Sequence, residues 1–578
     1  MQENGKFTRK FFDSQTRWTW IGEGSIGGKA AGLVKIDEIT AAIPRPETLA
    51  DIEIHIPTFT VVRTGIFDAF IERNRLREVI ESGSPDDVIA REFQKASLPA
   101  EILGDLHTVT QQVRTPLAVR SSSMLEDSLT QPFAGIYTTK MIPNNQPSPD
   151  ARFQKLLEAV KLVYASTFFK SARDYIRATG CQPEEEKMAV VIQEVVGKRF
   201  GDRFYPQVSG VARSYNFYPV GNARREDGVV SLALGLGKTI VDGDTCWTYS
   251  PERPNVAPPY NSFAELLEQT QTQFWAVNMG KPPEYDPTRE TEYLVRPNLL
   301  DAESDDTLSS LVSTYDSQSD RLKAGISSPG PRVLNFAGLL VHKQIPLNEI
   351  VKLLLDVCRN VVGYPVEIEF AVTFEPVRIG FLQVRPMTIS SEEVAITDED
   401  LATNDLLLAS ERVMGNGIEN SIRDVVFVKP ERFDLKFTRT IAAELEEMNR
   451  TLLEERRPYL LIGFGRWGSS DPWLGIPVNW GQVSGAKAIV EATLPAVNVD
   501  LSQGSHFFHN LVSFKVSYFS VPHTGRYAVN WEWLFRQRTA AETGFVRHVV
   551  LPFPLSMKVD GRTGRGVVRV RSHGDTTA

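Results

Sequence analysis

Cysteine is scarce in this sequence. Its 578 residues include three cysteines, Cys181, Cys246 and Cys358, and no two of them stand in a Cys-x-x-Cys pattern. This scarcity argues against a disulfide framework and against a cysteine-based zinc site. A reducing compartment fits such usage best. We therefore expect a cytoplasmic protein.

Long apolar runs and a basic excess are also missing. No run approaches the roughly 18 apolar residues that a membrane-spanning helix needs, and the opening MQENGKFTRKFF has no apolar core of a signal peptide. The 63 lysines and arginines are outnumbered by 72 aspartates and glutamates, which gives a net charge of −9. General nucleic-acid binders usually show the opposite balance. We expect neither a membrane nor a nucleic acid as a partner.

What is present is an ordinary globular composition at a length of several domains. Hydrophobic residues make up 42% and charged residues 23%, which excludes a disordered or collagen-like chain. Apolar residues recur at helical spacing in 64–82 and 153–178, and strand-like runs follow at 188–196, 207–212 and 229–234. This mixture predicts an α+β or α/β fold and argues against an all-α one; of the two we expect α+β.

Composition also indicates where the chain divides. The segment 279–332 is rich in Pro, Ser, Asp and Glu, and we expect an excursion or partly mobile insert there. A helix at 347–361 and a β-hairpin at 365–388 are predicted next. Residues 389–404 are polar and acidic, which is typical of a linker. A second part with a helix at about 437–456 then follows.

Gly24–Gly32, which reads GSIGGKAAG, is the first candidate for an anion-binding loop. Glycines let backbone N–H groups approach a phosphate, a helix N-terminus favours an anion, and Lys29 would neutralise phosphate charge. The segment lacks the GxxxxGK[ST] pattern of a Walker A loop. A tight turn before a helix explains it at least as well.

Leu117–Tyr137, LAVRSSSMLEDSLTQPFAGIY, brings Arg120 from an apolar strand into a run of serines. Arginine suits polyphosphate because its planar guanidinium binds two oxygens at once. Glu126 and Asp127 follow closely. An exposed loop with a structural Arg–Glu pair is therefore an equal alternative.

The hairpin at 365–388 carries the most specific chemistry. Alternation puts Glu367 and Glu369 on one face of PVEIEFAV, and it puts Gln383 and Arg385 on one face of GFLQVRPM. Carboxylate and amide oxygens suit Mg²⁺, and an arginine suits the phosphate beside it. The alternative is a solvated sheet face with ordinary cross-strand ion pairs.

Taken together, six blocks of the sequence resemble one known domain. In chain order they are IGGKAAG, AVRSSSMLED with FAG after it, VVIQEVV, SGVARS, LGLGK, and IEFAV with LQVRP. Over about 15–390 the chain resembles the PEP/pyruvate-binding domain, the ATP-grasp-like nucleotide domain of phosphoenolpyruvate synthase and pyruvate phosphate dikinase, which rifampicin phosphotransferases share. The resemblance implies two lobes, 1–200 and 201–390, that bind MgATP between them. A smaller mixed α/β domain, 391–578, would follow, and a diverged swivelling domain is one interpretation of it.

The resemblance also implies site residues, one by one. Lys29 and Arg120 match phosphate ligands of the family, and Arg385 matches the arginine of its LQxRP block. Glu369 and Gln383 match the pair that holds Mg²⁺. Other positions match residues that cover the nucleotide or line the adenine, namely Gly135, Thr139, Gln193, Glu194 and Val196.

Two positions differ from the family pattern. Glu367 stands where Asp is common, and it would be a second carboxylate near the metal. Lys238 stands in GLGK, where the family has GLGE. A lysine beside a triphosphate is electrostatically favourable, so ATP binding need not suffer. Any acid–base or metal role of that glutamate is in doubt.

The part after residue 390 departs further from the dikinases. Roughly 190 residues remain, whereas a TIM barrel needs about 250, and the family's SHAAI histidine block is missing. His506 in GSHFFHN is the nearest substitute as a phosphate-accepting catalytic residue, and packing in an aromatic strand or turn is the alternative. Arg466 in GFGRWG marks a second anion-binding loop or a structural turn capped by Trp467.

We therefore expect a MgATP-binding phosphotransferase that acts on an unidentified small-molecule or protein acceptor, with homo-oligomerisation left open. The alternative is a catalytically reduced regulatory module that binds ATP, or a subunit of a larger assembly. The complete set of Lys29, Arg120, Glu369, Gln383 and Arg385 favours the enzyme. The missing histidine block and barrel favour the alternative.

Overall fold

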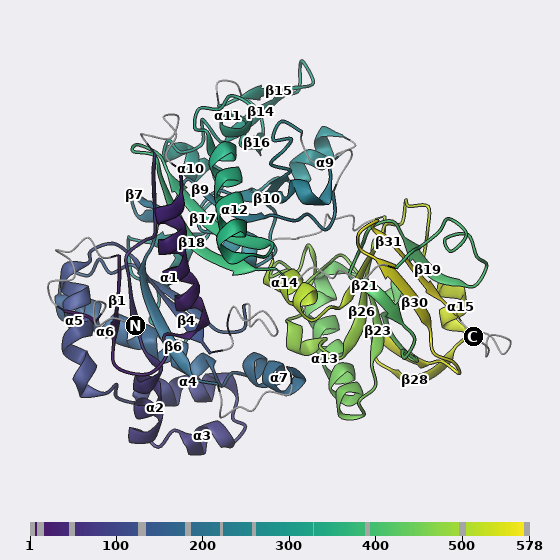
Figure 1. Ribbon diagram of the computed structural model, residues 1–578, viewed down its shortest axis with the longest axis horizontal. Coiled ribbons are helices and arrows are strands. Elements are labelled where there is room, and N and C mark those ends of the chain that lie inside the picture. Colours follow the sequence, from purple (N-terminus) through teal and green to yellow (C-terminus); the bar gives the residue numbers. More distant parts are fainter. Residues whose placement is uncertain are drawn as a thin grey trace. The chain divides into compact units, whose positions relative to one another are not determined.

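The chain divides into two compact units in the computed structural model (Figure 1). The first contains 1–214, 228–240 and 245–386, and the second contains 215–227, 241–244 and 387–578. The residues described are 6–8, 17–44, 52–124, 126, 135–179, 186–219, 223–256, 262–326, 329–387, 394–495 and 505–570. Cys181 and Asp127 lie outside them. The limits of the lobes and of the C-terminal domain stay predictions.

The N-terminal part of the first unit is built on a five-stranded sheet. Its order is β1 (Trp18–Ile21), β3 (Phe59–Val62), β6 (Met188–Glu194), β4 (Leu117–Ser123) and β5 (Thr139–Ile142). The helices of this part are α2 (Thr64–Arg73), α3 (Arg77–Glu81), α4 (Asp86–Lys95), α5 (Ala100–Gln112), α6 (Pro149–Ser166) and α7 (Lys170–Thr179). The single helix predicted at 153–178 is thus two helices. Between them Phe168 packs on the rings of Phe67 and Phe93.

A second, six-stranded sheet forms the other half of this unit. Its order is β11 (Trp247–Tyr249), β10 (Val229–Ala233), β9 (Val208–Arg213), β17 (Val366–Thr373), β18 (Arg378–Pro386) and β2 (Glu53–His55). Strand β2 pairs with β18 although it lies in the range predicted for the N-terminal lobe. One continuous hydrophobic core includes Val191 of β6 and Ile368 of β17, so it joins the two sheets.

Helix α1 (Gly27–Ala42) packs against both β4 and β18. Its buried residues Ala30, Leu33, Ile36 and Ile39 recur every three positions and so form one stripe along the helix. Helix α12 (Leu347–Val362) packs against β17 and ends at Gly363, whose φ of 78° gives the left-handed conformation that glycine adopts without strain. The predicted helix at 347–361 and the predicted hairpin are both confirmed.

The segment 279–332, where we expect an excursion or partly mobile insert, contains short helices and strands in its described residues. It contains β13 (Leu294–Val295), α10 (Leu299–Ser304), β14 (Val312–Asp316) and β15 (Arg321–Ala324), and it ends in β16 (Arg332–Leu334). A capping box between Asn298 and Asp301 starts α10. The Ser- and Asp-rich composition reflects exposed faces, whereas Leu311 and Val312 are buried. Short elements complete the unit: β7 (Lys198–Phe200), β8 (Arg203–Tyr205), β12 (Ala276–Asn278), α8 (Lys238–Val241), α9 (Phe263–Glu268) and α11 (Ala337–Leu340).

The second unit combines a mixed seven-stranded sheet with a four-stranded antiparallel one. The larger has the order β20 (Val413–Met414), β27 (Ser517–Val521), β26 (Ala486–Ala492), β23 (Tyr459–Phe464), β22 (Asp424–Val428), β29 (Val546–Val550) and β28 (Arg538–Glu542). The smaller has the order β19 (Leu406–Ser410), β31 (Arg565–Arg569), β30 (Ser556–Asp560) and β21 (Asn416–Glu419).

The four central strands of the larger sheet, β22, β23, β26 and β27, run parallel. Helix α13 (Thr438–Glu454) connects β22 to β23, and α14 (His506–Ser513) precedes β27. The predicted α+β class is confirmed. Among the described helices, none combines the length and the apolar character needed to cross a bilayer.

A buried ion pair ties the 286–292 segment to the first sheet and generates the first prediction. The Lys140 Nζ on β5 lies 2.6 Å from a carboxylate oxygen of Glu292, and both side chains are 1% exposed. Lys140 also donates to the backbone oxygens of Pro287 and Arg289, each at 3.0 Å. Because removing one partner leaves a buried charge uncompensated, Glu292→Gln should lower the free energy of unfolding by about 3 kcal/mol.

Urea unfolding followed by tryptophan fluorescence would measure this loss. The matched control is the double variant Lys140→Met with Glu292→Leu, which buries no charge and should lose clearly less. Equal losses in the single and double variants would contradict the interpretation.

Candidate functional site

Lys29 in the first turn of α1 is held by a carboxylate on the neighbouring chain segment. Its Nζ donates to Glu126 Oε1 at 3.0 Å and to Ser121 Oγ at 3.2 Å. The other oxygen of Glu126 accepts from the backbone N–H of Ser123 at 2.8 Å. The acidic partner in the LAVRSSSMLED block thus belongs to Lys29, and the Arg–Glu pair considered as the alternative for Arg120 does not form.

The two glycines before Lys29 allow α1 to approach the end of β4. A Cβ added to Gly28 would lie 1.6 Å from the backbone oxygen of Glu126. At Gly27, where φ is +75°, it would lie 1.8 Å from the backbone oxygen of Ser122. Only glycine fits at such distances. The GGK pattern therefore serves close helix–strand packing, and this packing brings Lys29 to Glu126.

Arg120 on β4 joins the two sheets of the first unit. Its Nη1 donates to Gln193 Oε1 on β6 at 3.0 Å, and its Nη2 donates to Gln383 Oε1 on β18 at 2.9 Å. A further bond of 3.3 Å reaches the backbone oxygen of Leu382. One guanidinium thus brings together predicted site residues that are far apart in the sequence.

The hairpin pairs as the alternation predicts. Glu367 lies opposite Arg385, and Glu369 lies opposite Gln383. Arg385 donates from Nε to Glu367 Oε1 at 2.6 Å and from Nη2 to Glu369 Oε1 at 2.9 Å. Glu367 is 1% exposed and Arg385 is 3% exposed. The cross-strand ion pairs of the alternative therefore form, but on a buried sheet face and not on the solvated one that it supposed.

Arg213 on β9 completes this cluster, and sequence reasoning missed it. The Arg213 Nε donates to Glu367 Oε2, so Glu367 lies between two arginines. Burial lowers the pKa of Arg213, while the nearby Glu367 carboxylate opposes that shift. A usable signal was present in SGVARS, because an arginine inside an otherwise apolar strand needs a buried acidic partner.

Glu369 and Gln383 fit the chemistry of a magnesium site. They supply a carboxylate and an amide oxygen, which are the hard ligands that Mg²⁺ prefers. In the structure the Gln383 oxygen accepts from Arg120 and one oxygen of Glu369 accepts from Arg385, whereas both oxygens of Glu367 are engaged by arginines. The described residues include no group of three or more acidic, histidine or cysteine side chains placed for a metal. Mg²⁺ commonly fills its remaining positions with water and substrate phosphate.

The remaining predicted nucleotide residues lie at different places on the two sheets. Thr139 on β5 is the register partner of Arg120, and Gly135 is exposed before it. Glu194 at the end of β6 accepts a bond of 2.7 Å from the Thr115 hydroxyl. Val196 contacts β18 at Gly380, where an added Cβ would lie 2.4 Å from its Cγ2. Their nucleotide roles stay predictions.

Lys238, the departure from the family's GLGE block, begins α8. Its Nζ lies 3.5 Å from a carboxylate oxygen of Glu290, which belongs to the 279–332 segment. A carboxylate is thus present beside this position, although it comes from another part of the chain. The sequence pattern gave no signal for this pairing.

His506 is the first residue of α14 and lies in the second unit. Ser505 caps this helix, because its hydroxyl accepts from the Phe508 N–H at 3.2 Å. His506 and His509 thus lie in a helix and not in the strand or turn that we considered, while the burial of His509 agrees with the packing role of that alternative. Arg466 donates to the Gly243 backbone oxygen at 3.1 Å, and the buried Trp467 donates from Nε1 to the Val490 oxygen at 3.2 Å.

Glu186, just before β6, is a buried carboxyl group close to the Lys29 pair. It is 3% exposed, although GCQPEEEK reads as a charged loop and gave no signal of burial. Burial raises the pKa of Glu186 to about 7; the Ser123 hydroxyl opposes this, and the Glu126 carboxylate adds to it. Glu186 therefore changes charge near neutral pH beside the residues that hold Lys29.

This raised pKa predicts a pH-dependent stability. Between its unfolded pKa near 4.5 and its folded pKa near 7, Glu186 binds more protons in the native state, so stability falls as pH rises. A difference of that size corresponds to about 3 kcal/mol. The stability advantage of Glu186→Gln over the unsubstituted protein should therefore be larger at pH 8 than at pH 5, by about that amount.

Urea unfolding at both pH values would measure the gain. Glu38→Gln is the matched control, because the Glu38 side chain is 63% exposed and its substitution should leave the pH dependence unchanged. A Glu186→Gln gain that is the same at pH 5 and pH 8 would contradict the assignment.

Comparison with known proteins agrees with this geometry. The family model described as pyruvate phosphate dikinase, AMP/ATP-binding domain, matches residues 23–405. Phosphoenolpyruvate synthase of Aeropyrum pernix is 28% identical over 389 residues, which cover 64% of this chain and 41% of that protein. Rifampicin phosphotransferase of Streptomyces sviceus is 27% identical over 233 residues, which cover 38% of this chain and 23% of that protein.

The chain thus spans less than half the length of these curated relatives. The matched range contains both sheets of the first unit except strand β1, and every predicted site residue except His506. Because the family model covers well over half of the sequence, the chain belongs to the pyruvate phosphate dikinase, AMP/ATP-binding domain family.

Proposed function

We propose that this protein binds MgATP at Lys29, Arg120, Glu369, Gln383 and Arg385, in an ATP-grasp-like arrangement, and transfers a phosphoryl group to an unidentified acceptor. The observation that carries the proposal is the position of Arg120, whose guanidinium contacts both Gln193 and Gln383. It brings phosphate-binding and magnesium-binding types of side chain from two sheets to one place.

Lys29 and Arg120 differ in what holds them in the structure. Lys29 is paired with the Glu126 carboxylate, whereas Arg120 is held by neutral amide oxygens. A triphosphate would offer Arg120 stronger, charge-assisted hydrogen bonds than those amide oxygens do. Glu369 and Gln383 would hold Mg²⁺, which when bound neutralises phosphate charge.

The acceptor and the route to it belong to the same proposal. The relatives' names include a synthase and a phosphotransferase, and both fit transfer to a small molecule; a protein acceptor is also compatible. His506 is the proposed carrier in the second unit. Its neutral imidazole would form a P–N bond as the P–O bond to the departing nucleotide breaks. A cytoplasmic location fits the cysteine-poor sequence.

Loss of nucleotide binding is the direct test of the site. Lys29→Ala and Glu369→Ala each remove a proposed contact to MgATP. Each variant should therefore lose the rise in thermal midpoint that MgATP gives the unsubstituted protein. A ligand at a hundred times its Kd stabilises by about 2.7 kcal/mol, which differential scanning fluorimetry detects. Lys343→Ala and Glu349→Ala are matched controls, because these residues form an exposed pair in the same unit. A full MgATP shift in both site variants would overturn the assignment.

The phosphoryl transfer is tested with ATP labelled at the β- or γ-phosphate. Incubation with Mg²⁺ should release ADP or AMP and leave an acid-labile label on the protein, because a P–N bond hydrolyses in acid. That label should vanish in His506→Ala and persist in His342→Ala, which removes an exposed histidine. Tight MgATP binding without turnover would favour a regulatory module instead, and a label that survives in His506→Ala would exclude His506 as the carrier.

A further inference from the structure

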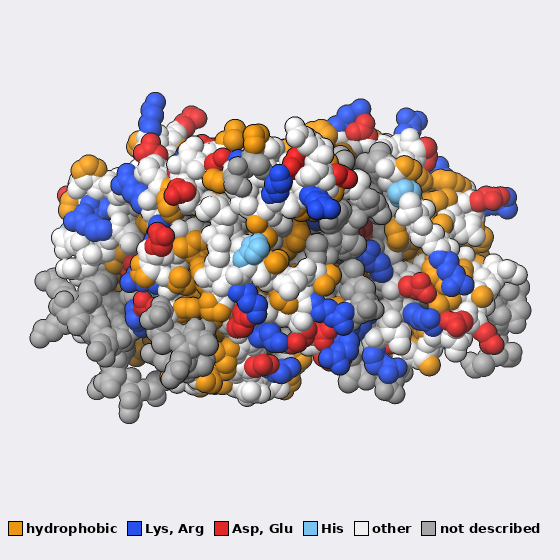
Figure 2. All heavy atoms as spheres, turned by 90° about the horizontal axis from the view of Figure 1, so that it is seen from above, with side chains coloured by type: hydrophobic (Ala, Val, Ile, Leu, Met, Phe, Trp, Pro, Cys, Tyr) orange, Lys and Arg blue, Asp and Glu red, His pale blue; other side chains and the backbone are white. Residues whose placement is uncertain are grey.

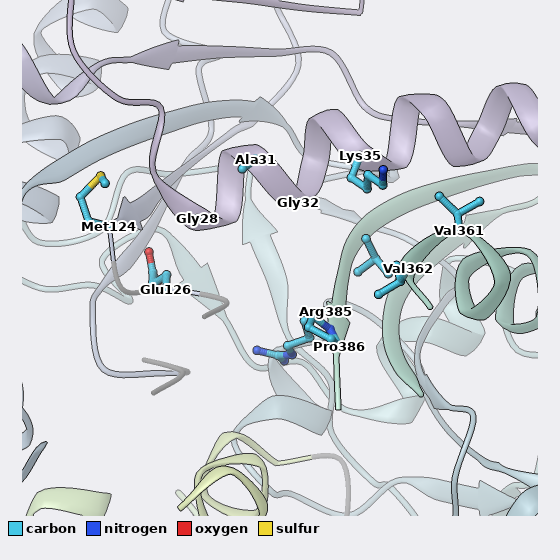
Figure 3. Close-up of a pocket in the computed structure, with 11 residues that line it drawn as sticks. Gly28, Ala31, Gly32, Lys35, Met124, Glu126, Val361, Val362, Arg385 and Pro386 are labelled. Carbon is cyan, nitrogen blue, oxygen red and sulfur yellow. The ribbon is translucent and has the colours of Figure 1, made fainter. Parts of the chain in front are cut away.

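A cavity of about 450 Å³ lies beside the proposed nucleotide site in the first unit. Its walls come from α1, from the C-terminal end of α12 and from the end of β18. Figure 3 shows Ala31, Gly32 and Lys35 along α1 on one side, with Arg385 and Pro386 of β18 across from them. The volume falls within the range of roughly 300–1,000 Å³ that is usual for small-molecule sites.

The walls of this cavity are mostly apolar or small. Positions 28, 31, 32 and 35 are three or four residues apart, so they share one face of α1. Ala31 and Gly32 have almost no side chain, which leaves room for a ligand beside this face, whereas Gly28 packs directly on Glu126. Val361 and Val362, at the C-terminal end of α12, line another part of the cavity. These surfaces fit the apolar body of a small ligand.

Lys35 supplies the charge that is available to a ligand. Its Nζ is paired with Glu38 at 2.8 Å, with side chains 44% and 63% exposed, and exposed pairs of this kind contribute about 1 kcal/mol or less. The other two charged side chains of the lining are committed more tightly. Arg385 binds Glu367 and Glu369, and Glu126 binds Lys29. An anionic group of a ligand can therefore replace Glu38 as the partner of Lys35 with little loss of free energy.

The cavity is separate from most of the proposed nucleotide site. Of the five residues assigned to MgATP, only Arg385 is among those that line it. We propose that the cavity is a second ligand site, which takes a small organic anion with an apolar body, such as a short-chain carboxylate. The site would hold the anion at Lys35 and the body against Val361 and Val362. The cavity borders the proposed nucleotide site, because Arg385 belongs to both and Glu126 in its lining is the partner of Lys29.

Three probes of one chain length separate charge from apolar contact. Hexanoate, 1-hexanol and hexylammonium would be titrated into the full chain, and binding would be followed by saturation-transfer NMR. We expect hexanoate to bind about threefold to fivefold more tightly than 1-hexanol, as one partly exposed charge pair allows. Hexylammonium should bind most weakly. Hexylammonium binding as tightly as hexanoate would overturn the proposal.

Variants in α1 place the binding in the cavity. Ala31→Phe should fill the hollow and weaken hexanoate binding at least tenfold, whereas Ala41→Phe, at an exposed position of the same helix outside the lining, should not. Lys35→Gln should reduce hexanoate binding to the level of 1-hexanol, and Lys35→Arg should retain it. The Lys35 variants decide the matter even if Ala31→Phe fails to fold. Equal hexanoate binding in Lys35→Gln and Lys35→Arg, or in both phenylalanine variants, would overturn the site.

Discussion

The candidate site depends on one buried carboxylate, Glu367, which lies between Arg213 and Arg385. Buried charges are tolerated only when they are paired and hydrogen-bonded. Three strands must therefore stay in register, because β9, β17 and β18 each contribute one member. Arg385 also holds Glu369, whose register partner Gln383 receives Arg120. A structural ion pair inside one sheet thus positions groups that reach to the other sheet.

Helix α1 couples this network to the rest of the unit. Its first turn packs so closely on β4 that Gly27 and Gly28 have no room for a Cβ. The same packing directs Lys29 to Glu126, and the following turns line the cavity. Figure 2 shows that Lys and Arg side chains lie interspersed with Asp and Glu over the face that it presents. In the first unit the described contacts of Lys29 and of the cavity lining thus rest on local pairing of charges and on packing.

Local periodicity predicted the hairpin because each strand shows its own two-residue alternation, and antiparallel pairing through a short turn follows from that. The alternation of residues did not predict the β-bulge between Glu369 and Phe370. Partners far apart in the sequence were harder to predict. Arg213 and Glu290 become partners of Glu367 and Lys238 only through the fold. In the segment 279–332 polar composition indicated the exposed faces but gave no sign of the buried residues Leu308, Leu311 and Val312 behind them.

In the second unit, too, the sequence pattern did not predict the local structure around a candidate site residue. The aromatic and histidine run GSHFFHN reads as a strand or turn when only apolar content is considered. Ser505 in front of it is a good N-cap, and its hydroxyl accepts from the Phe508 N–H, so a helix begins at His506. Phe507, Phe508 and Leu511 are then buried at helical spacing. The capping residue, more than hydrophobicity, therefore decides the structure around His506, and it gives that side chain a fixed place at the start of α14.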